Sequence, residues 1–298
     1  MPRHYLSIDI GGTNIKFALI DHSGNIIERD KVATPRNREE FLSALQQVVS
    51  RFLEIAAVCV SVPGIVHTGH GRVKFTGALG FMGQFELADY MKEISGKSVF
   101  VGNDGNCAAL AEMWLGRLSG IDNGATITLG TSVGGGLVIN GNLIEGTHFR
   151  AGELSAIVNN YNDAKATTGS NTSAVKMIEA VATRCQLPDL KDGRRAFGEI
   201  NAGNPDALEI FQPFCRRVAI LISNIQAVVD LERVLIGGGI SVQPIVVEEV
   251  RRQFKALQES DRRIRDDIEM PEIMAAQFGN DANILGALYG YLLQTEYK

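Results

Sequence analysis

The same short pattern occurs twice in the chain: an apolar strand, a turn rich in glycine and threonine, and a second apolar strand. The first copy occupies residues 5–20, with the turn Gly11-Gly12-Thr13-Asn14, and the second occupies residues 125–139, with the turn Gly130-Thr131-Ser132. Tight glycine turns between short strands are typical of β-hairpins. A loose duplication of this kind predicts two similar domains that face each other across a central cleft.

The segments that follow the first hairpin indicate an α/β fold. Apolar residues recur at helical spacing in residues 38–55, and residues 56–62 and 99–104 are predicted to be buried strands. A length of 298 residues, at about 150 residues per domain, corresponds to two domains. We expect a smaller N-terminal α/β domain over residues 1–104 and a larger α/β domain over residues 105–282.

The second half of the chain is predicted to be rich in helix. A short strand at residues 234–236 leads directly into the triplet Gly237-Gly238-Gly239. The last helix, over about residues 283–298, is expected to pack back on the first domain. Helical periodicity marks residues 173–185, 205–229, 243–257 and 283–293.

Charge and composition exclude several classes of function. Lys and Arg number 29 against 34 Asp and Glu, so the formal net charge is −5, which argues against a nucleic-acid partner. No apolar stretch approaches the roughly 20 residues that span a bilayer. We therefore expect no membrane partner. The chain has no CxxC pair, so we expect reduced thiols and a cytoplasmic protein. The four cysteines are Cys59, Cys107, Cys185 and Cys215.

The first turn carries residue types that suit a phosphate. The N–H groups of Gly11 and Gly12 can approach an anion closely, and Thr13 adds a hydroxyl donor. Asp9, at the end of the preceding strand, can hold Mg²⁺ through water. An ordinary hairpin turn is the alternative interpretation. The segment assigned to the nucleotide also includes Asn14 and Lys16.

The second turn repeats this chemistry, so two loops could hold the two ends of a triphosphate. Its residues assigned to the nucleotide are Gly130, Thr131, Ser132 and Gly134. Gly238 and Gly239 lie between a strand and a helix, where a nucleoside can lie on bare backbone. A Rossmann fingerprint does not fit there, because Val242 stands where the third glycine should be.

Asn103 and Asp104 follow a predicted strand, at the sheet edge where ligands of α/β proteins gather. An Asp in that place can orient and deprotonate a hydroxyl that attacks phosphorus. Capping of the helix that follows is the alternative interpretation. Glu153 offers a further acceptor, with a solvated surface acid as its alternative.

Together these segments resemble the ROK family of the actin-like ATPase and hexokinase superfamily, over nearly the whole chain. Residues 9–13 resemble its first phosphate motif, residues 103–106 its catalytic Asn-Asp-Ala-Asn, and residues 129–136 its second phosphate motif. The further matches are a sugar-side loop at residues 62–64, Ala-Gly-Glu at residues 151–153 and an adenosine motif at residues 237–241. The resemblance implies two actin-like, ribonuclease H-like domains.

The resemblance also implies an ATP-dependent sugar kinase in which Asp104 is the base that activates a sugar hydroxyl, usually O6. Asn103 and Glu153 would hold ring hydroxyls beside Gly64, the two glycine turns would bind the phosphates of ATP, and Mg²⁺ would lie near Asp9. The family is commonly dimeric, so we expect a homodimer.

One departure from the family pattern bears on the substrate. Where the family commonly has Gly-Glu-x-Gly-His, this chain has Gly152-Glu153-Leu154-Ser155-Ala156, and the cysteine-rich zinc motif that should follow is missing. We therefore expect no structural zinc, and we interpret His67 and His70 as polar loop residues. Family members without this His are similar to β-glucoside kinases, so we expect a sugar with a substituent at C1.

Other functions stay open. A glucokinase, a mannokinase or another free-hexose kinase would use the same motifs, and a non-catalytic sugar sensor could bind the same ligand. An actin-like ATPase without a sugar is disfavoured, because Asn103 and Glu153 would have no ligand to hold. Gly105 in place of Ala and Ser132 in place of Gly are smaller departures, with which activity is expected to survive.

Overall fold

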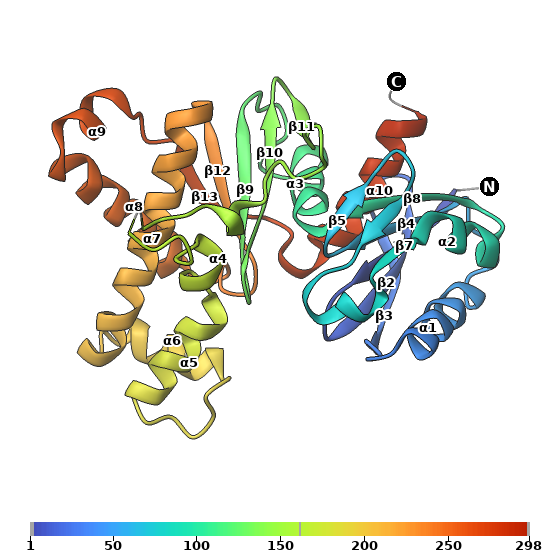
Figure 1. Ribbon diagram of the computed structural model, residues 1–298, viewed down its shortest axis with the longest axis horizontal. Coiled ribbons are helices and arrows are strands. Elements are labelled where there is room, and N and C mark those ends of the chain that lie inside the picture. Colours follow the sequence, from blue (N-terminus) through green and yellow to red (C-terminus); the bar gives the residue numbers. More distant parts are fainter. Residues whose placement is uncertain (1–2, 161, 297–298) are drawn as a thin grey trace. The chain divides into compact units, whose positions relative to one another are not determined.

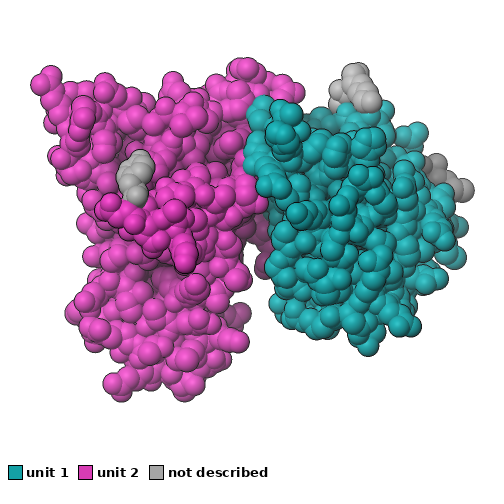
Figure 2. Space-filling view, in the orientation of Figure 1, with its two compact units in different colours: residues 1–119, 143–151, 281–298 teal, residues 120–142, 152–280 magenta. Residues whose placement is uncertain are grey.

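The computed structural model describes residues 3–160 and 162–296 (Figure 1). The chain divides into two compact units (Figure 2). Unit 1 is built from Met1–Ser119, Leu143–Ala151 and Asp281–Lys298, and unit 2 from Gly120–Asn142 and Gly152–Asn280. Each unit contains helices and a five-stranded mixed sheet, so the predicted α/β class is confirmed.

The sheet of unit 1 has the strand order β3-β2-β1-β4-β8. Its centre is β1 (His4–Ile10), which pairs antiparallel with β2 (Asn14–Asp21) and parallel with β4 (Ala57–Val62). β3 (Ile26–Ala33) extends the antiparallel side, and β8 (Ser98–Asn103) extends the parallel side. The carboxyl ends of the three parallel strands therefore lie along one edge, which is where ligands gather in such sheets.

Alternation along β1 assigns helices to the two faces of this sheet. The side chains of Leu6, Ile8 and Ile10 share one apolar cluster with residues of α1 (Arg38–Ser50) and α2 (Leu87–Ser95). The intervening Ser7 points to the other face, where its Oγ donates to the carbonyl of Ile284 at 2.6 Å.

The face that Ser7 marks is covered by α10 (Ala282–Thr295), with α3 (Asp104–Trp114) packed against it. The two helices approach closely, because a Cβ on Gly286 would lie only 1.7 Å from the carbonyl oxygen of Cys107. This packing places residues 105–119 in unit 1, whereas the sequence assigned them to the second domain.

A small antiparallel sheet and a 3₁₀ turn lie between β4 and α2 in the chain. The sheet contains β5 (Ile65–His67), β6 (Arg72–Lys74) and β7 (Gln84–Glu86), and the 3₁₀ turn is η1 (Gly77–Met82). Sequence periodicity did not predict these strands, because three residues are too few to establish a period of two.

The second five-stranded sheet has the order β11-β10-β9-β12-β13, which repeats the order of the first sheet strand for strand along the chain. Four of its strands lie in unit 2, and β11 lies at the boundary, with Leu143 and Ile144 assigned to unit 1. β9 pairs antiparallel with β10 and parallel with β12, as β1 pairs with β2 and β4. The predicted duplication is therefore present in the topology. The strands are β9 (Gly124–Leu129), β10 (Val133–Ile139), β11 (Asn142–Ile144), β12 (Arg233–Gly237) and β13 (Glu272–Ala275).

Unit 2 is rich in helix, as predicted. The longest helix is α7 (Pro205–Val229), which starts where Asn204 caps it and Pro205 takes the first helical position. Its apolar side chains join β9 and β12 in one core. The other helical segments are η2 (Leu154–Ala156), α4 (Thr168–Asn171), α5 (Ala174–Arg184), α6 (Gly193–Asn201), α8 (Pro244–Ser260), α9 (Arg262–Asp267) and η3 (Gly279–Asp281).

Candidate functional site

The turn between β1 and β2 is held by short backbone and side-chain hydrogen bonds. Gly11 N donates to Asn14 O at 3.0 Å, and Thr34 donates through its Oγ1 to Gly11 O at 2.7 Å and through its N–H to Thr13 O at 2.9 Å. Among the residues that the structure describes, no protein acceptor pairs with the N–H groups of Gly12 and Thr13. These two donors are therefore available to an anion.

Asp9 lies at the end of β1 and is 6% exposed. Its Oδ1 accepts a hydrogen bond from Nδ2 of Asn283 at 3.0 Å, and its Oδ2 lies 3.5 Å from Nζ of Lys16, its register partner in β2. Asn283 was not predicted from the sequence. It lies 274 residues from Asp9 in the chain, and no spacing signals such a contact.

Two further segments of unit 1 are closely packed, one of them against this turn. A Cβ on Gly12 would lie 3.0 Å from Cβ of Ala78, so η1 touches the turn directly. Gly64 has a φ of +114°, and a Cβ there would lie 2.5 Å from the carbonyl oxygen of Lys74. The loop between β4 and β5 therefore requires glycine at this position.

The pair Asn103 and Asp104 is fixed at the start of α3. Asn103 is the N-cap, because its Oδ1 accepts from Asn106 N at 3.1 Å. Its Nδ2 donates to Gly64 O at 3.0 Å and to Oδ1 of Asp104 at 3.1 Å, and Gly105 N donates to the same Oδ1 at 2.9 Å. The capping role is thus filled by Asn103, and the Asp104 carboxylate is oriented by two donors.

The carboxylates of Asp9 and Asp104 lie near the same buried side chain. Burial raises the pKa of the Cys107 thiol well above its ordinary value, and the negative charges of Asp104 and Asp9 raise it further. In the parallel ladders Asp9 is level with Ser61, and Val62 is level with Asn103. Both carboxylates therefore belong to the carboxyl edge of the sheet.

In unit 2 the turn between β9 and β10 occupies the equivalent topological position. Gly130 N donates to Ser132 O at 3.0 Å, and Gly130 O accepts from Ala174 N at 2.9 Å and from Oγ of Ser173 at 3.4 Å. Thr131 and Ser132 are exposed at the tip of the turn. This loop is thus supported by the N-terminus of α5.

The glycine triplet at the end of β12 lies beside this second turn. Gly238 has a φ of +91°, and a Cβ there would lie 2.1 Å from the carbonyl oxygen of Leu129, which directly precedes the turn. Ser241 closes the loop, since its Oγ donates to Gly238 O at 2.8 Å. Gly239 has no atom within 4 Å of a Cβ position, so this part of the loop faces open space.

One glycine of β10, Gly135, is required by close packing, whether or not a ligand binds there. A Cβ on Gly135 would lie 2.4 Å from Cδ1 of Leu154, and a Cβ on Gly152 would lie 2.8 Å from the carbonyl oxygen of Gly135. The Ala-Gly-Glu motif therefore packs directly on β10. Gly134 is not crowded in this way, because a Cβ there would lie 3.7 Å from Cβ of Thr128, an ordinary van der Waals contact.

Glu153 is exposed, and its Oε1 accepts a hydrogen bond from Oγ of Ser155. Residues 154–172, where a zinc motif would follow, contain neither Cys nor His. Within residues 3–160 and 162–296, no group of three or more His, Cys, Asp or Glu could hold a metal ion. His67 and His70 lie at the β5–β6 turn with ring centroids 4.8 Å apart.

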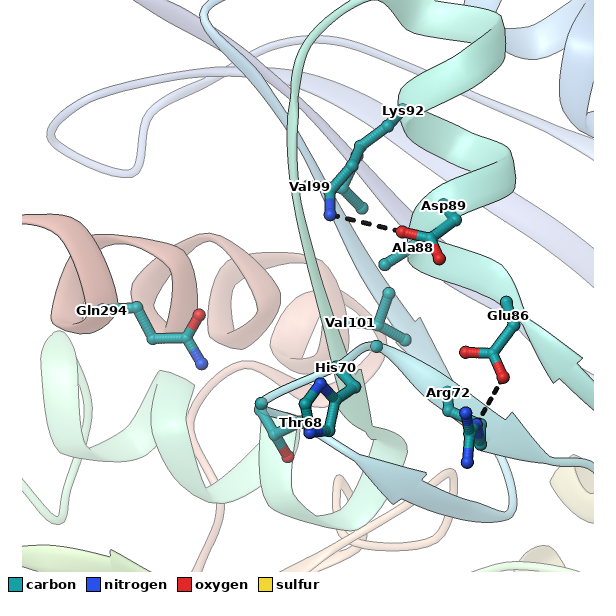
Figure 3. Close-up of a pocket in the computed structure, with 12 residues that line it drawn as sticks. Thr68, His70, Arg72, Glu86, Ala88, Asp89, Lys92, Val99, Val101 and Gln294 are labelled. Atoms are coloured by element: carbon teal, nitrogen blue, oxygen red, sulfur yellow. Dashed lines mark hydrogen bonds and ion pairs between the residues drawn. The ribbon is translucent and has the colours of Figure 1, made fainter.

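A separate polar hollow of 370 Å³ in unit 1 contains none of the predicted site residues (Figure 3). Its charged side chains pair with one another, Arg72 with Glu86 and Lys92 with Asp89 at 3.4 Å. The lining charges therefore offset each other. It is lined by Thr68, Gly69, His70, Gly71, Arg72, Glu86, Ala88, Asp89, Lys92, Val99, Val101 and Gln294.

The predicted site residues thus form two groups, one in each unit. Unit 1 holds the first turn with its flanking Asp9 and Lys16, together with Gly64, Asn103 and Asp104. Unit 2 holds the second turn, the glycine triplet and Glu153. Sequence reasoning missed Asn283, Thr34 and Ala78, which reach the first turn from distant parts of the chain.

Known proteins match this chain over nearly its whole length. The sequence profile of the ROK family matches residues 5–294. A protein of Listeria innocua named β-glucoside kinase is 28% identical over 293 residues, which cover 96% of each chain. None of the helices within the described residues is both long and apolar enough to cross a membrane.

Two solved structures show the same fold over almost the full length. A ROK family protein from Streptococcus pneumoniae in complex with sucrose superimposes with a TM-score of 0.87 at 28% identity, covering 99% of this chain and 100% of the other. A ROK family glucokinase from Streptomyces griseus in complex with glucose and AMPPNP gives a TM-score of 0.81 at 25% identity, covering 96% and 98%.

Proposed function

The chain belongs to the ROK family, and from that premise we propose that it is an ATP-dependent carbohydrate kinase, which transfers the γ-phosphoryl group of ATP to O6 of a sugar. The observation that carries this proposal is the Asp104 carboxylate. It is oriented by Asn103 Nδ2 and Gly105 N at the start of a helix, in the same unit as a glycine turn with free N–H donors.

Asp104 acts as the general base in this mechanism. It accepts the proton of the sugar hydroxyl as the oxygen attacks the γ-phosphorus, so that an O–P bond forms while the bond from the γ-phosphorus to the β–γ bridging oxygen breaks and ADP leaves. Asn103 positions Asp104 and the sugar, and Glu153 accepts a hydrogen bond from a ring hydroxyl. Gly64 provides the sugar-side loop in this assignment.

The nucleotide is assigned to the glycine turns. The N–H groups of Gly12 and Thr13, which no protein acceptor among the described residues pairs with, donate to phosphate oxygens. Gly11, whose own N–H closes the turn on Asn14, lets the phosphate approach the backbone beside Asn14 and Lys16. The adenosine lies on Gly238 and Gly239. The phosphate contacts of the second turn come from Gly130, Thr131, Ser132 and Gly134. ATP arrives with Mg²⁺, which keeps several waters, and the buried Asp9 carboxylate suits such a water-mediated contact.

The preferred acceptor in this proposal is a sugar with a substituent at C1, such as a β-glucoside. Ala156 replaces the imidazole that the family commonly places beside C1, and its methyl group is exposed on η2. A methyl group leaves room for a second sugar ring where an imidazole would fill it. The name of the Listeria innocua relative supports the same choice.

A coupled assay of ADP release tests the reaction and the acceptor together. Gentiobiose and cellobiose are compared with glucose, mannose and N-acetylmannosamine at saturating MgATP. We expect the highest kcat/KM for the β-linked disaccharides, and a strong preference for a free hexose contradicts the C1 proposal. Sugar binding without any ADP release would instead identify a sugar sensor.

Substitution of Asp104 tests the mechanism. We expect Asp104→Ala to lower kcat by about 10²- to 10⁴-fold, with sugar affinity changed far less. Asp104→Asn keeps the size of the side chain and the acceptor oxygen for Asn103 while removing the base, so it should lose as much. Equal rates in wild type and in either variant rule out this mechanism.

We further assign the protein to the cytoplasm as a homodimer that needs no structural zinc. Light scattering coupled to size-exclusion chromatography measures the mass of the assembly. A zinc-selective chelator, added with excess Mg²⁺, should leave both activity and melting temperature unchanged. Loss of either on chelation, with recovery on adding zinc, contradicts the zinc-free assignment.

A further inference from the structure

The segment of residues 157–173 takes the place in the chain where the resemblance predicts a zinc motif. The sequence of this segment contains no Cys or His, and the structure describes its residues 157–160 and 162–173. An isolated bridge joins Val158 to Thr167, and the side-chain amides of Asn159 and Asn171 exchange two hydrogen bonds at 2.9 Å each. Hydrogen bonds therefore close this segment on itself.

One end of the segment is attached to the second glycine turn. Oγ of Ser173 and the N–H of Ala174 both donate to Gly130 O. Gly169, in the short helix α4, lies against the tip of the same turn, since a Cβ there would be 2.7 Å from Oγ of Ser132. This contact gives a structural context to Ser132, a departure from the family pattern that the sequence left unexplained.

The same glycine also lies against the Ala-Gly-Glu motif. A Cβ on Gly169 would be 2.9 Å from Cβ of Ser155 and 3.1 Å from its carbonyl oxygen. Oγ of Ser155 donates to the carboxylate of Glu153, and Thr168 N donates to Ile157 O at 2.8 Å. One residue without a side chain therefore separates the turn that carries Ser132 from the residue that orients Glu153.

Space, and not backbone conformation, makes glycine necessary at residue 169. Its φ is not positive, unlike that of Gly152 or Gly238, so alanine fits the backbone. Distances of 2.7 and 2.9 Å are below the separation that real Cβ atoms keep from their neighbours. A methyl group at this position must displace Ser132, Ser155 or both.

We propose that Gly169 is a positioning residue that couples the nucleotide loop to the sugar motif in unit 2. The proposal rests on the proposed function, because it takes the turn at Ser132 as a phosphate contact and Glu153 as a sugar contact. Contact through Gly169 sets the distance between the Ser132 turn and Glu153. The hydrogen bonds of the 157–173 segment thus organise this part of unit 2, as a bound metal could otherwise do.

The first test is the steady-state kinetics of Gly169→Ala with Gly198→Ala as the control. Gly198 lies in α6 with nothing within 4 Å of its Cβ position, so its substitution changes helix propensity alone. We expect Gly169→Ala to raise the KM for ATP and the KM for the sugar by about 5-fold or more each. Values equal to those of Gly198→Ala overturn the proposal.

A second substitution separates coupling from general destabilisation. Ser132→Gly removes the hydroxyl group that the new methyl group meets, so Gly169→Ala with Ser132→Gly should recover the KM for ATP and keep the raised KM for the sugar. A purely structural defect would change both constants together. Recovery of both, or of neither, therefore overturns the proposal.

Hydrogen exchange on the full-length protein gives a readout that does not depend on activity. Ser132→Gly alone opens the contact with Gly169, so we expect faster deuterium uptake in peptides that cover residues 152–156 and 167–171. If deuterium uptake rises only in the turn at residues 130–132, the coupling is overturned. Because this measurement uses Ser132→Gly, it remains decisive even if Gly169→Ala does not fold. Absence of phosphorylation by the wild type would contradict the proposed function, and this exchange measurement would still decide the inference.

Discussion

The two glycine turns occupy the same place in two sheets of identical strand order, yet they are supported in different ways. The turn of unit 1 is held by residues from distant parts of the chain: Thr34 on its backbone, Ala78 against Gly12, and Asn283 on the neighbouring Asp9. The turn of unit 2 is held at Gly130 by the backbone of the helix that follows the 157–173 segment.

This difference shows what a duplicated topology determines and what it leaves free. Pairing of a first strand with an antiparallel second strand fixes where each turn must lie. The partners of each turn depend on the segments inserted between the common strands, which differ completely in the two units. Substitutions that remove one partner at a time should therefore affect one turn and spare the other.

The largest expected effect is that of Gly238→Ala in unit 2. The new Cβ would lie 2.1 Å from the carbonyl of Leu129, at a φ of +91° that alanine rarely adopts. We expect a loss of about 3 kcal/mol or more in the free energy of unfolding, because overpacking and backbone strain add. Denaturant unfolding measures this loss.

Gly239→Ala is the matched control for that substitution, since its Cβ position is open and its φ is not positive. It should leave the free energy of unfolding within about 0.5 kcal/mol of wild type. An equal loss in the two variants would show that the close approach to Leu129 does not support the second turn.

Asn283→Leu should disturb the first turn alone. It removes the donor to a carboxylate that is 6% exposed, which costs about 1–3 kcal/mol. We expect a raised KM for MgATP and an unchanged KM for the sugar. Gln294→Ala, at an exposed position of the same helix, controls for changes in α10. A KM for the sugar that rises equally contradicts a role confined to Asp9.

Smaller effects should follow from loosening each turn by one hydrogen bond. Thr34→Val removes the hydroxyl donor to Gly11 O in unit 1. Ser173→Ala removes the donor to Gly130 O in unit 2, together with the cap that Ser173 Oγ provides by accepting from Lys176 N. Each should cost about 1 kcal/mol. Hydrogen exchange should show faster uptake only in the turn whose partner was removed, and uptake in both turns would contradict their independence.

One thiol, Cys185, should differ from the other three in its reaction with a labelling reagent. Cys59 and Cys107 of unit 1 and Cys215 of unit 2 are buried, and burial raises the pKa of each. Cys185 of unit 2 is half-buried, and its pKa is also raised by burial. A raised pKa means less thiolate at pH 8, so a thiol reagent should label Cys185 first and slowly. Its rate should still rise above pH 9, and prior labelling of one of the buried thiols would contradict the assignment.

Local sequence signals predicted the elements that depend on local chemistry. The bounds of α7 at Pro205–Val229 match the expected range, because a cap and a proline mark its start and apolar periodicity continues to its end. The two hairpin turns and the strand end at Asn103 were predicted for the same reason. Each of these features is specified by one continuous stretch of chain, and the longest such stretch is the 25 residues of α7.

Features that depend on tertiary contact could not be predicted in this way. The polar segment around Gly169 gives no sign that Ser132 and Ser155 meet there, and Asn283 has no motif that points to Asp9. Gly135 was interpreted as part of a ligand loop, although the close approach of Leu154 also requires glycine there. In each case the reason for the residue lies in a neighbour far along the chain.

The division of unit 1 into three stretches of chain has a consequence for its biosynthesis. When a ribosome has translated residues 1–119, the nascent chain already contains the first turn and Asp104, but it lacks α10. The sheet face that Ser7 marks is then uncovered, and Asp9 lacks the donor from Asn283. Closing these contacts must wait until residues 120–280 have been made. The half of the protein that is translated first is therefore the half that is completed last, and its exposed sheet is the surface that a chaperone would need to protect in the meantime.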